Sequence, residues 1–107
     1  MSFQDFYHQV FWKEEKVKNA PNSPSYSGSL IKDWEIFKGR TAQKCARCGK
    51  ALTEDDKVGG HVLKVPSNSI DYYVLPLCKD CNHPSVKQPY YVPTRDLVRL
   101  IDIKREK

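Results

Sequence analysis

The chain has 107 residues, of which 39% are hydrophobic and 29% are charged, with four cysteines and a formal net charge of +5 at pH 7. This length fits one small domain, and such a domain often needs additional stabilisation, for example by a bound metal ion, because its hydrophobic core is small. No apolar run approaches the roughly 18 residues of a membrane span, and the opening MSFQDFYHQV lacks the apolar region of a signal peptide. We therefore expect a cytoplasmic protein that has no membrane partner.

The first expected element is a helix over residues 3–11. Ser2 stands at its start, where helices prefer a capping residue. Its apolar positions recur at helical spacing, and they are Phe3, Phe6, Tyr7, Val10 and Phe11. We expect this aromatic face to pack on the rest of the chain, the alternative being that it binds another protein.

A linker and a second helix follow. The segment NAPNSPSYSGS over residues 19–29 is rich in turn-forming residues, which predicts a linker or a long loop. The next segment, SLIKDWEIFKG, predicts a short helix with Ser29 as its cap and Gly39 as its left-handed terminator. The chain is thus expected to divide into an amino-terminal helical segment with linker, residues 1–43, and a cysteine-containing domain, residues 44–107.

Two cysteine pairs carry the strongest chemical signal in the sequence. CARC holds Cys45 and Cys48, and CKDC holds Cys78 and Cys81. Because thiols stay reduced in a cytosol, pairs at this spacing favour metal ligands over disulfides. Four thiolates complete the tetrahedral shell of a structural Zn²⁺ ion and leave no open position for a substrate. A redox-active pair and an iron–sulfur cluster are the alternatives.

The segment between the pairs predicts a β-hairpin. HVLKV at 61–65 and IDYYVLPL at 70–77 are rich in β-branched and aromatic residues, and PSNS between them supplies turn formers. The order of CARCGK, GGHV and PLCKDCN resembles the zinc-containing HNH family, over roughly residues 44–88. The resemblance implies an α+β class: a small treble-clef zinc domain made of a knuckle, a hairpin and a short helix, here flanked by amino- and carboxy-terminal helices. It also implies a bacterial or phage-type protein.

The same resemblance implies a role for His61, the histidine of GGHV. In HNH nucleases the histidine on this strand is the general base that activates water, and a second divalent metal stabilises the phosphate. The residue before the base is usually a metal ligand, but this chain has Gly60 there. The asparagine that orients the base and a later metal ligand are also replaced, at positions 73–74 and 85–86. These departures favour a module without efficient nuclease activity.

The last 20 residues predict an extended segment followed by a helix. QPYYVP at 88–93 contains two prolines and should be extended. TRDLVRLIDIKREK predicts a helix that begins at its cap, Thr94, and its basic end suits the negative pole of the helix.

Basic residues near the cysteine pairs indicate a partner. Arg47, Lys50, Lys79 and Lys87 lie close to the pairs in sequence, although the positive charge is spread along the whole chain. We therefore expect a zinc-stabilised, HNH-like binding module that engages nucleic acid through these residues. The alternatives are a protein-interaction factor, an inhibitor or adaptor, that uses the aromatic helix, and an active metal-dependent endonuclease with His61 as its base.

Overall fold

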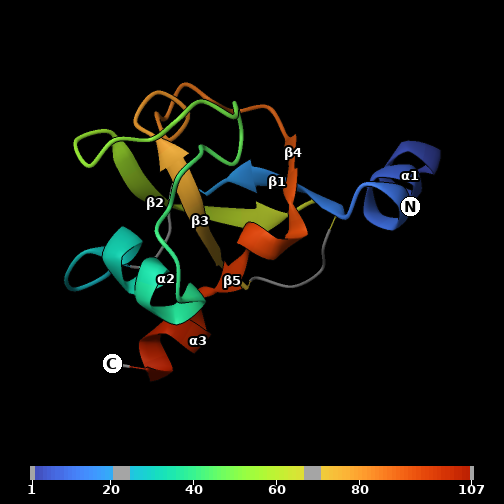
Figure 1. The fold of residues 1–107 in the computed structure, drawn as a ribbon. Coiled ribbons are helices and arrows are strands. Elements are labelled where there is room, and N and C mark those ends of the chain that lie inside the picture. Colours follow the sequence, from blue (N-terminus) through green and yellow to red (C-terminus); the bar gives the residue numbers. More distant parts are fainter. Residues whose placement is uncertain (1, 21–24, 67–70, 107) are drawn as a thin grey trace.

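The computed structural model describes residues 2–20, 25–66 and 71–106, which form a mixed α+β domain. Figure 1 shows these elements along the chain. They are α1 (Phe3–Phe11), β1 (Glu14–Asn19), α2 (Leu30–Lys38), β2 (Lys57–Lys64), β3 (Tyr73–Cys78), β4 (Tyr90–Pro93), β5 (Val98–Arg99) and α3 (Leu100–Arg105), with a 3₁₀ turn at Thr94–Asp96. None of these helices is long and apolar enough to cross a membrane.

The strands form one antiparallel sheet in the order β4-β1-β2-β3-β5. Strand β1 comes from the amino-terminal segment and lies between β4 and β2 (Figure 1). Its Val17 is opposite both Tyr90 and Lys64. The expected hairpin is present as β2 and β3, but most of its turn lies outside the described residues, as do residues 21–24 of the expected linker. A single sheet therefore joins the segment before residue 44 to the cysteine-containing segment.

Buried side chains lie on both faces of this sheet. Neighbouring residues of a strand point to opposite faces, and on β3 Leu75 belongs to one buried cluster while Val74 belongs to the other. The first cluster includes Cys45, Cys78 and Cys81 and joins the sheet to the cysteine loops. The second joins the sheet to α2 and α3. The cysteine loops and the two helices therefore cover opposite faces of the sheet.

Helix α2 begins and ends where the sequence predicts. The Ser29 hydroxyl accepts a hydrogen bond from the Lys32 N–H at 3.3 Å, and Gly39 adopts the left-handed conformation with φ of 68°. The helix packs through Trp34, which is fully buried and donates from Nε1 to the Asp96 carbonyl at 2.9 Å. Both predicted caps of this helix are confirmed.

Helix α1 is also confirmed, but its orientation differs from the expectation. The Ser2 hydroxyl accepts from the Asp5 N–H at 3.1 Å and caps the helix. Asp5 is buried against the sheet, whereas the aromatic face points away from it and is exposed. The expectation that this face packs on the rest of the chain is therefore wrong, because α1 is held by hydrogen bonds from its polar face to β1 and β4.

Two other expected helices differ from the structure. The short helix expected at the second cysteine pair does not form there: residues 79–82 form turns, and Pro84 lies two residues further on. The carboxy-terminal helix α3 begins at Leu100 and not at Thr94, because Val98 and Arg99 pair with β3 and obtain their backbone partners there. The extended segment predicted at 88–93 contains β4.

Candidate metal centre

The first cysteine loop is closed by its own backbone. The Cys45 N–H donates to the Lys50 carbonyl at 2.9 Å, and the Gly49 N–H donates to the Cys45 carbonyl at 2.9 Å. Gly49 has a φ of 80°, which glycine adopts without a steric penalty. The Ala46 N–H donates to the Pro76 carbonyl at 2.9 Å and so ties the loop to β3. The local sequence CARCGK therefore forms the tight turn that it predicts.

The second cysteine loop starts at the end of β3. Cys78 is the last residue of that strand, and its carbonyl accepts from the Asn82 N–H at 3.1 Å. Asn19 of β1 donates from Nδ2 to the Cys81 carbonyl at 2.9 Å, and the Tyr90 hydroxyl donates to the Asn19 side-chain oxygen. The loop is thus fixed by β1, β3 and β4 together.

The four cysteine sulfurs meet between these loops. All four Sγ atoms lie within 4.8 Å of one another, and those of Cys48 and Cys78 are 3.9 Å apart. A tetrahedral zinc ion with Zn–S bonds near 2.3 Å separates its sulfurs by about 3.8 Å. Cys45, Cys78 and Cys81 are buried, Cys48 is exposed, and none of the four forms a disulfide. This donor set and spacing fit a soft divalent metal ion such as zinc.

The protonation of the cluster also favours a bound cation. Burial acts to raise the pKa of Cys45, but N–H groups of Cys48, Cys78 and Arg47 outweigh it and lower that pKa to about 7. Burial raises the pKa of Cys81 to about 12, against the effect of a hydrogen bond from Arg47. The Cys45 thiol therefore loses its proton readily, whereas the Cys81 thiol keeps its proton. A bound metal ion would stabilise both sulfurs as thiolates, because its positive charge offsets their negative charges.

Arg47 is directed toward the cysteines. Its Nη1 donates to the Cys81 sulfur at 3.4 Å, and its guanidinium carbon lies 5.4 Å from the centre of the Tyr90 ring. A thiolate and an aromatic face both attract a cation. The charged group of Arg47, expected to contact nucleic acid, is therefore engaged within the domain.

The other predicted basic residues divide into two kinds. Lys50 forms an ion pair with Asp56 at 2.8 Å, and hydrogen bonding to that carboxylate raises the pKa of Lys50. Lys79 and Lys87 are exposed, as is Lys44 beside the first cysteine. None of the ion pairs formed among residues 2–20, 25–66 and 71–106 involves these three lysines. Among the basic residues in or near the cysteine pairs in sequence, these three therefore remain available to a partner.

His61 lies in β2, opposite Val74 of the second buried cluster and thus on the face away from the cysteines. Its Nε2 is buried and has no hydrogen-bond partner in the described part of the chain. Burial and the charge of Lys104 lower the pKa of His61, so the ring is neutral at pH 7. A neutral imidazole can accept a proton. However, the one cluster of metal-binding side chains found among the described residues is the cysteine group.

The two glycines of GGHV lie within extended β2, where elements approach closely from both faces. A Cβ atom on Gly60 would lie 2.5 Å from Leu77 Cδ1 and 3.1 Å from Asn82 Oδ1. A Cβ atom on Gly59 would lie 3.0 Å from the backbone nitrogen of Ile31 in α2. The strand thus leaves no room at Gly60 for the metal-binding side chain that HNH nucleases usually carry before the base.

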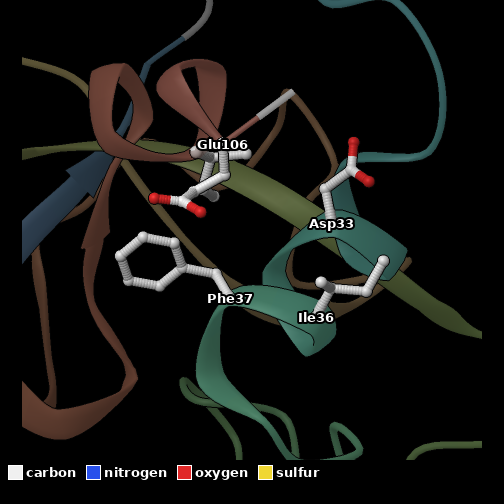
Figure 2. A pocket seen from close by; sticks show the side chains of 5 residues that line it. Asp33, Ile36, Phe37 and Glu106 are labelled. Atoms are coloured by element: carbon white, nitrogen blue, oxygen red, sulfur yellow. The ribbon is translucent and has the colours of Figure 1, made fainter.

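A separate hollow of about 510 Å³ lies between α2 and the end of α3. Figure 2 shows Asp33, Ile36 and Phe37 on α2, with Glu106 facing them from the end of the chain. The Asp33 carboxylate accepts a hydrogen bond from the Tyr26 hydroxyl. This hollow is on the helical side of the sheet and shares no residue with the cysteine centre.

Three residues that support the metal centre are not identified by the sequence pattern. The sequence places Asn19 in a linker and Tyr90 in an extended segment, and it gives Asp56 no role, although all three fix the cysteine loops. No local pattern marks them, because the Asn19 and Tyr90 contacts join residues 62 and 71 positions apart and Asp56 accepts from the Lys79 N–H, 23 positions away. Comparison of the chain with protein-family models, with curated proteins and with solved structures finds no match. The centre is therefore interpreted from its own chemistry.

Proposed function

We propose that Cys45, Cys48, Cys78 and Cys81 hold a structural zinc ion in a small HNH-like binding module that engages nucleic acid. The observation that carries this proposal is the group of four sulfurs within 4.8 Å of one another. Zinc accepts an all-thiolate shell, and four protein ligands leave no position for a substrate. Since binding of such an ion is coupled to folding, its role is to hold the two cysteine loops on the sheet.

Lys44, Lys79 and Lys87 support nucleic acid as the partner. All three are exposed; Lys44 precedes the first cysteine, Lys79 lies within the second loop, and Lys87 follows the second loop along the chain. Arg47 and Lys50 instead position these loops, through Cys81 and Asp56. Lysine contacts to phosphates carry affinity without reading the base sequence. We therefore propose weak binding to the nucleic-acid backbone without sequence preference.

His61 is structural in this proposal. Cleavage of a phosphodiester requires a group that stabilises the developing charge as well as a base. The contact of Gly60 with Leu77 excludes a carboxylate at the position before His61, and His61 itself faces the α2 and α3 side of the sheet. The treble-clef class and the HNH relation remain part of the proposal, supported by the order of knuckle, hairpin and second cysteine pair.

Binding is tested by titrating labelled oligonucleotides with the zinc-loaded chain over a range of salt concentrations. Three phosphate contacts predict that the logarithm of the association constant falls with the logarithm of salt concentration with a slope of about −2.7 for duplex DNA. For single strands the expected slope is about −2. A salt-independent affinity would contradict the proposed phosphate contacts.

A pair of variants locates the surface. The test variant is Lys44→Gln, Lys79→Gln and Lys87→Gln, which should lose measurable binding. The control makes the same change of charge on the helical side, through Lys38→Gln, Lys104→Gln and Arg105→Gln, and should bind as the wild type does. Retained binding in the test variant, or equal loss in both variants, would refute the lysine surface.

The endonuclease alternative has its own assay. Supercoiled DNA is incubated with Mg²⁺, Mn²⁺ or Ni²⁺ and either the wild type or His61→Ala, and we expect no cleavage by either. Metal-dependent cleavage that disappears in His61→Ala would replace the binding module with an enzyme.

A further inference from the structure

Helix α1 is attached to the domain by its polar face. The Tyr91 hydroxyl donates to Asp5 at 2.6 Å, and the His8 ring stacks on the Tyr91 ring with 3.7 Å between centroids. His8 Nδ1 also lies 2.7 Å from a carboxylate oxygen of Glu14 in β1. These contacts fix the helix against β1 and β4. Helices on soluble domains normally bury their apolar face. Because α1 exposes its apolar face instead, this face indicates a binding partner.

The exposed side of α1 and the residue after it form one apolar surface, which we call the α1 face. Its members are between 40% and 80% exposed, and they are Phe3, Phe6, Tyr7, Val10, Phe11 and Trp12. The Tyr7 ring lies 5.2 Å from that of Phe11 and 6.2 Å from that of Trp12. The rings are therefore already ordered against one another before any partner binds.

The size of the α1 face matches one side of a stable dimer. Each aromatic side chain offers roughly 150–250 Å², so the exposed fractions leave about 500–800 Å² of apolar surface uncovered. A typical stable interface buries about 800 Å² on each partner. Patches above a few hundred Å² are uncommon on monomers.

The lack of charged side chains on the α1 face indicates which kind of partner binds it. Helix α1 contains no Lys or Arg, and its one carboxylate, Asp5, is buried on the other side. The nearest basic residue in sequence is Lys13, which is exposed and follows Trp12. A membrane-surface helix carries several basic residues beside its apolar face, and a nucleic-acid surface needs several cations, so a single lysine after the helix fits neither. A helix face without charged side chains does fit a second copy of itself, because two chains of net charge +5 meet there with only Lys13 of each copy next to the face in sequence.

We propose that the chain forms a symmetric homodimer through the α1 face. In such a dimer the same apolar surface is used on both chains, which is the usual geometry of homodimers. The proposal goes beyond the zinc-stabilised binding function and does not depend on it, since the cysteine loops contribute no residue to the α1 face.

The test measures the molar mass of the zinc-loaded full chain by analytical ultracentrifugation from about 1 to 200 µM. Phe11→Glu places a carboxylate on each copy of the interface, and we expect it to raise the dimer dissociation constant at least about 30-fold. The matched control is Ile36→Glu, since Ile36 is 76% exposed but lies on α2. That control should dimerise like the wild type.

A second readout uses the tryptophans. Trp34 is fully buried and Trp12 is exposed, so dimerisation should shift the emission of Trp12 to shorter wavelength as the protein concentration rises. A wild type that stays monomeric over the whole range overturns the proposal, even if α1 captures another protein. A folded Phe11→Glu variant that dimerises as the wild type does also overturns it, as does equal weakening by Ile36→Glu.

Discussion

Replacement of Gly60 by alanine tests the close packing that separates this chain from a nuclease site. Gly60 is buried, and its new methyl group would lie 2.5 Å from Cδ1 of Leu77, a fully buried side chain. Overpacking of this kind costs about 1–3 kcal/mol. Alanine returns about 0.5–1 kcal/mol because glycine is unfavourable within a strand. A carbon–carbon contact of 2.5 Å lies at the upper end of that overpacking range, about 2–3 kcal/mol. The net loss in the free energy of unfolding should therefore be about 1–2.5 kcal/mol, or roughly 5–20 °C in melting temperature.

The assay is thermal and urea unfolding of the zinc-loaded protein. Gly39→Ala serves as a control for backbone strain, because Gly39 has φ of 68° but no neighbouring atom would lie within 4 Å of the added methyl group. Both variants should be destabilised, for different reasons. Only Gly60→Ala should be relieved by Leu77→Ala, since that change removes the contacting carbon and leaves a cavity for the new methyl group.

A Gly60→Ala variant as stable as the wild type would refute the packing argument, and so would a loss that persists unchanged in the Leu77→Ala background. The same contact should make Gly60→Asp strongly destabilising. A carboxylate there would be buried against Leu77 and unpaired, at several kcal/mol, compared with the roughly 5–15 kcal/mol of total stability that is usual for a domain. We therefore expect that placing at position 60 the carboxylate that the HNH resemblance implies unfolds the domain and creates no nuclease.

Three further predictions concern the metal centre and His61, which is half-buried. Elemental analysis should find one zinc ion per chain. The Cys78→Ser variant should lose both the ion and the cooperative melting transition, because metal binding and folding are coupled. A stable metal-free variant would contradict this. Arg47→Met should speed transfer of zinc to a chelator several-fold, because Arg47 donates to the Cys81 sulfur, whereas Lys44→Met should not change the rate. For His61, the pKa is lowered in the folded state, so the unfolded chain binds the proton more readily as the pH falls below about 6.5. The free energy of unfolding therefore has no penalty from His61 above that pH and falls as the pH drops below it. Between pH 7.5 and 5.5 the wild type should lose more stability than His61→Leu does. Equal losses in the two proteins would refute this prediction.

The features that can be predicted from the sequence depend on adjacent residues. Ser29 and Gly39 cap α2 through contacts within one turn of the helix, so their roles follow from residue type and position. The cysteine pairs are similar, since each loop sets the spacing of its own two sulfurs. That the two loops meet follows only from the hairpin that joins them, which β-branched and aromatic residues also predict.

The features that the sequence does not predict depend on distant partners. Strand β1 has only Val17 as an apolar residue, and it forms a strand because β4 and β2 supply hydrogen bonds on both sides. Periodicity defines the aromatic face of α1 but not its direction, which is set by Asp5 and by Tyr91, 86 positions away. The carboxy-terminal helix starts late for the same reason, because Val98 pairs with β3.

Strand β4 places two adjacent tyrosines in separate parts of the domain. The Tyr90 hydroxyl donates to Asn19, which in turn holds the Cys81 carbonyl. The Tyr91 hydroxyl donates to Asp5 and supports α1. Because neighbouring strand residues point to opposite faces, one short strand stabilises the metal loop on one side and the seat of α1 on the other.

This alternation predicts that the two tyrosines can be separated by experiment. Tyr91→Phe removes the hydroxyl that satisfies buried Asp5, so amide hydrogen exchange in α1 should become faster while zinc retention stays unchanged. Tyr90→Phe removes the hydroxyl that orients Asn19, so zinc should transfer faster to a chelator while exchange in α1 stays unchanged. If each substitution altered both readouts, β4 would transmit strain between the metal loop and α1, and the two regions would have to be treated as one coupled unit.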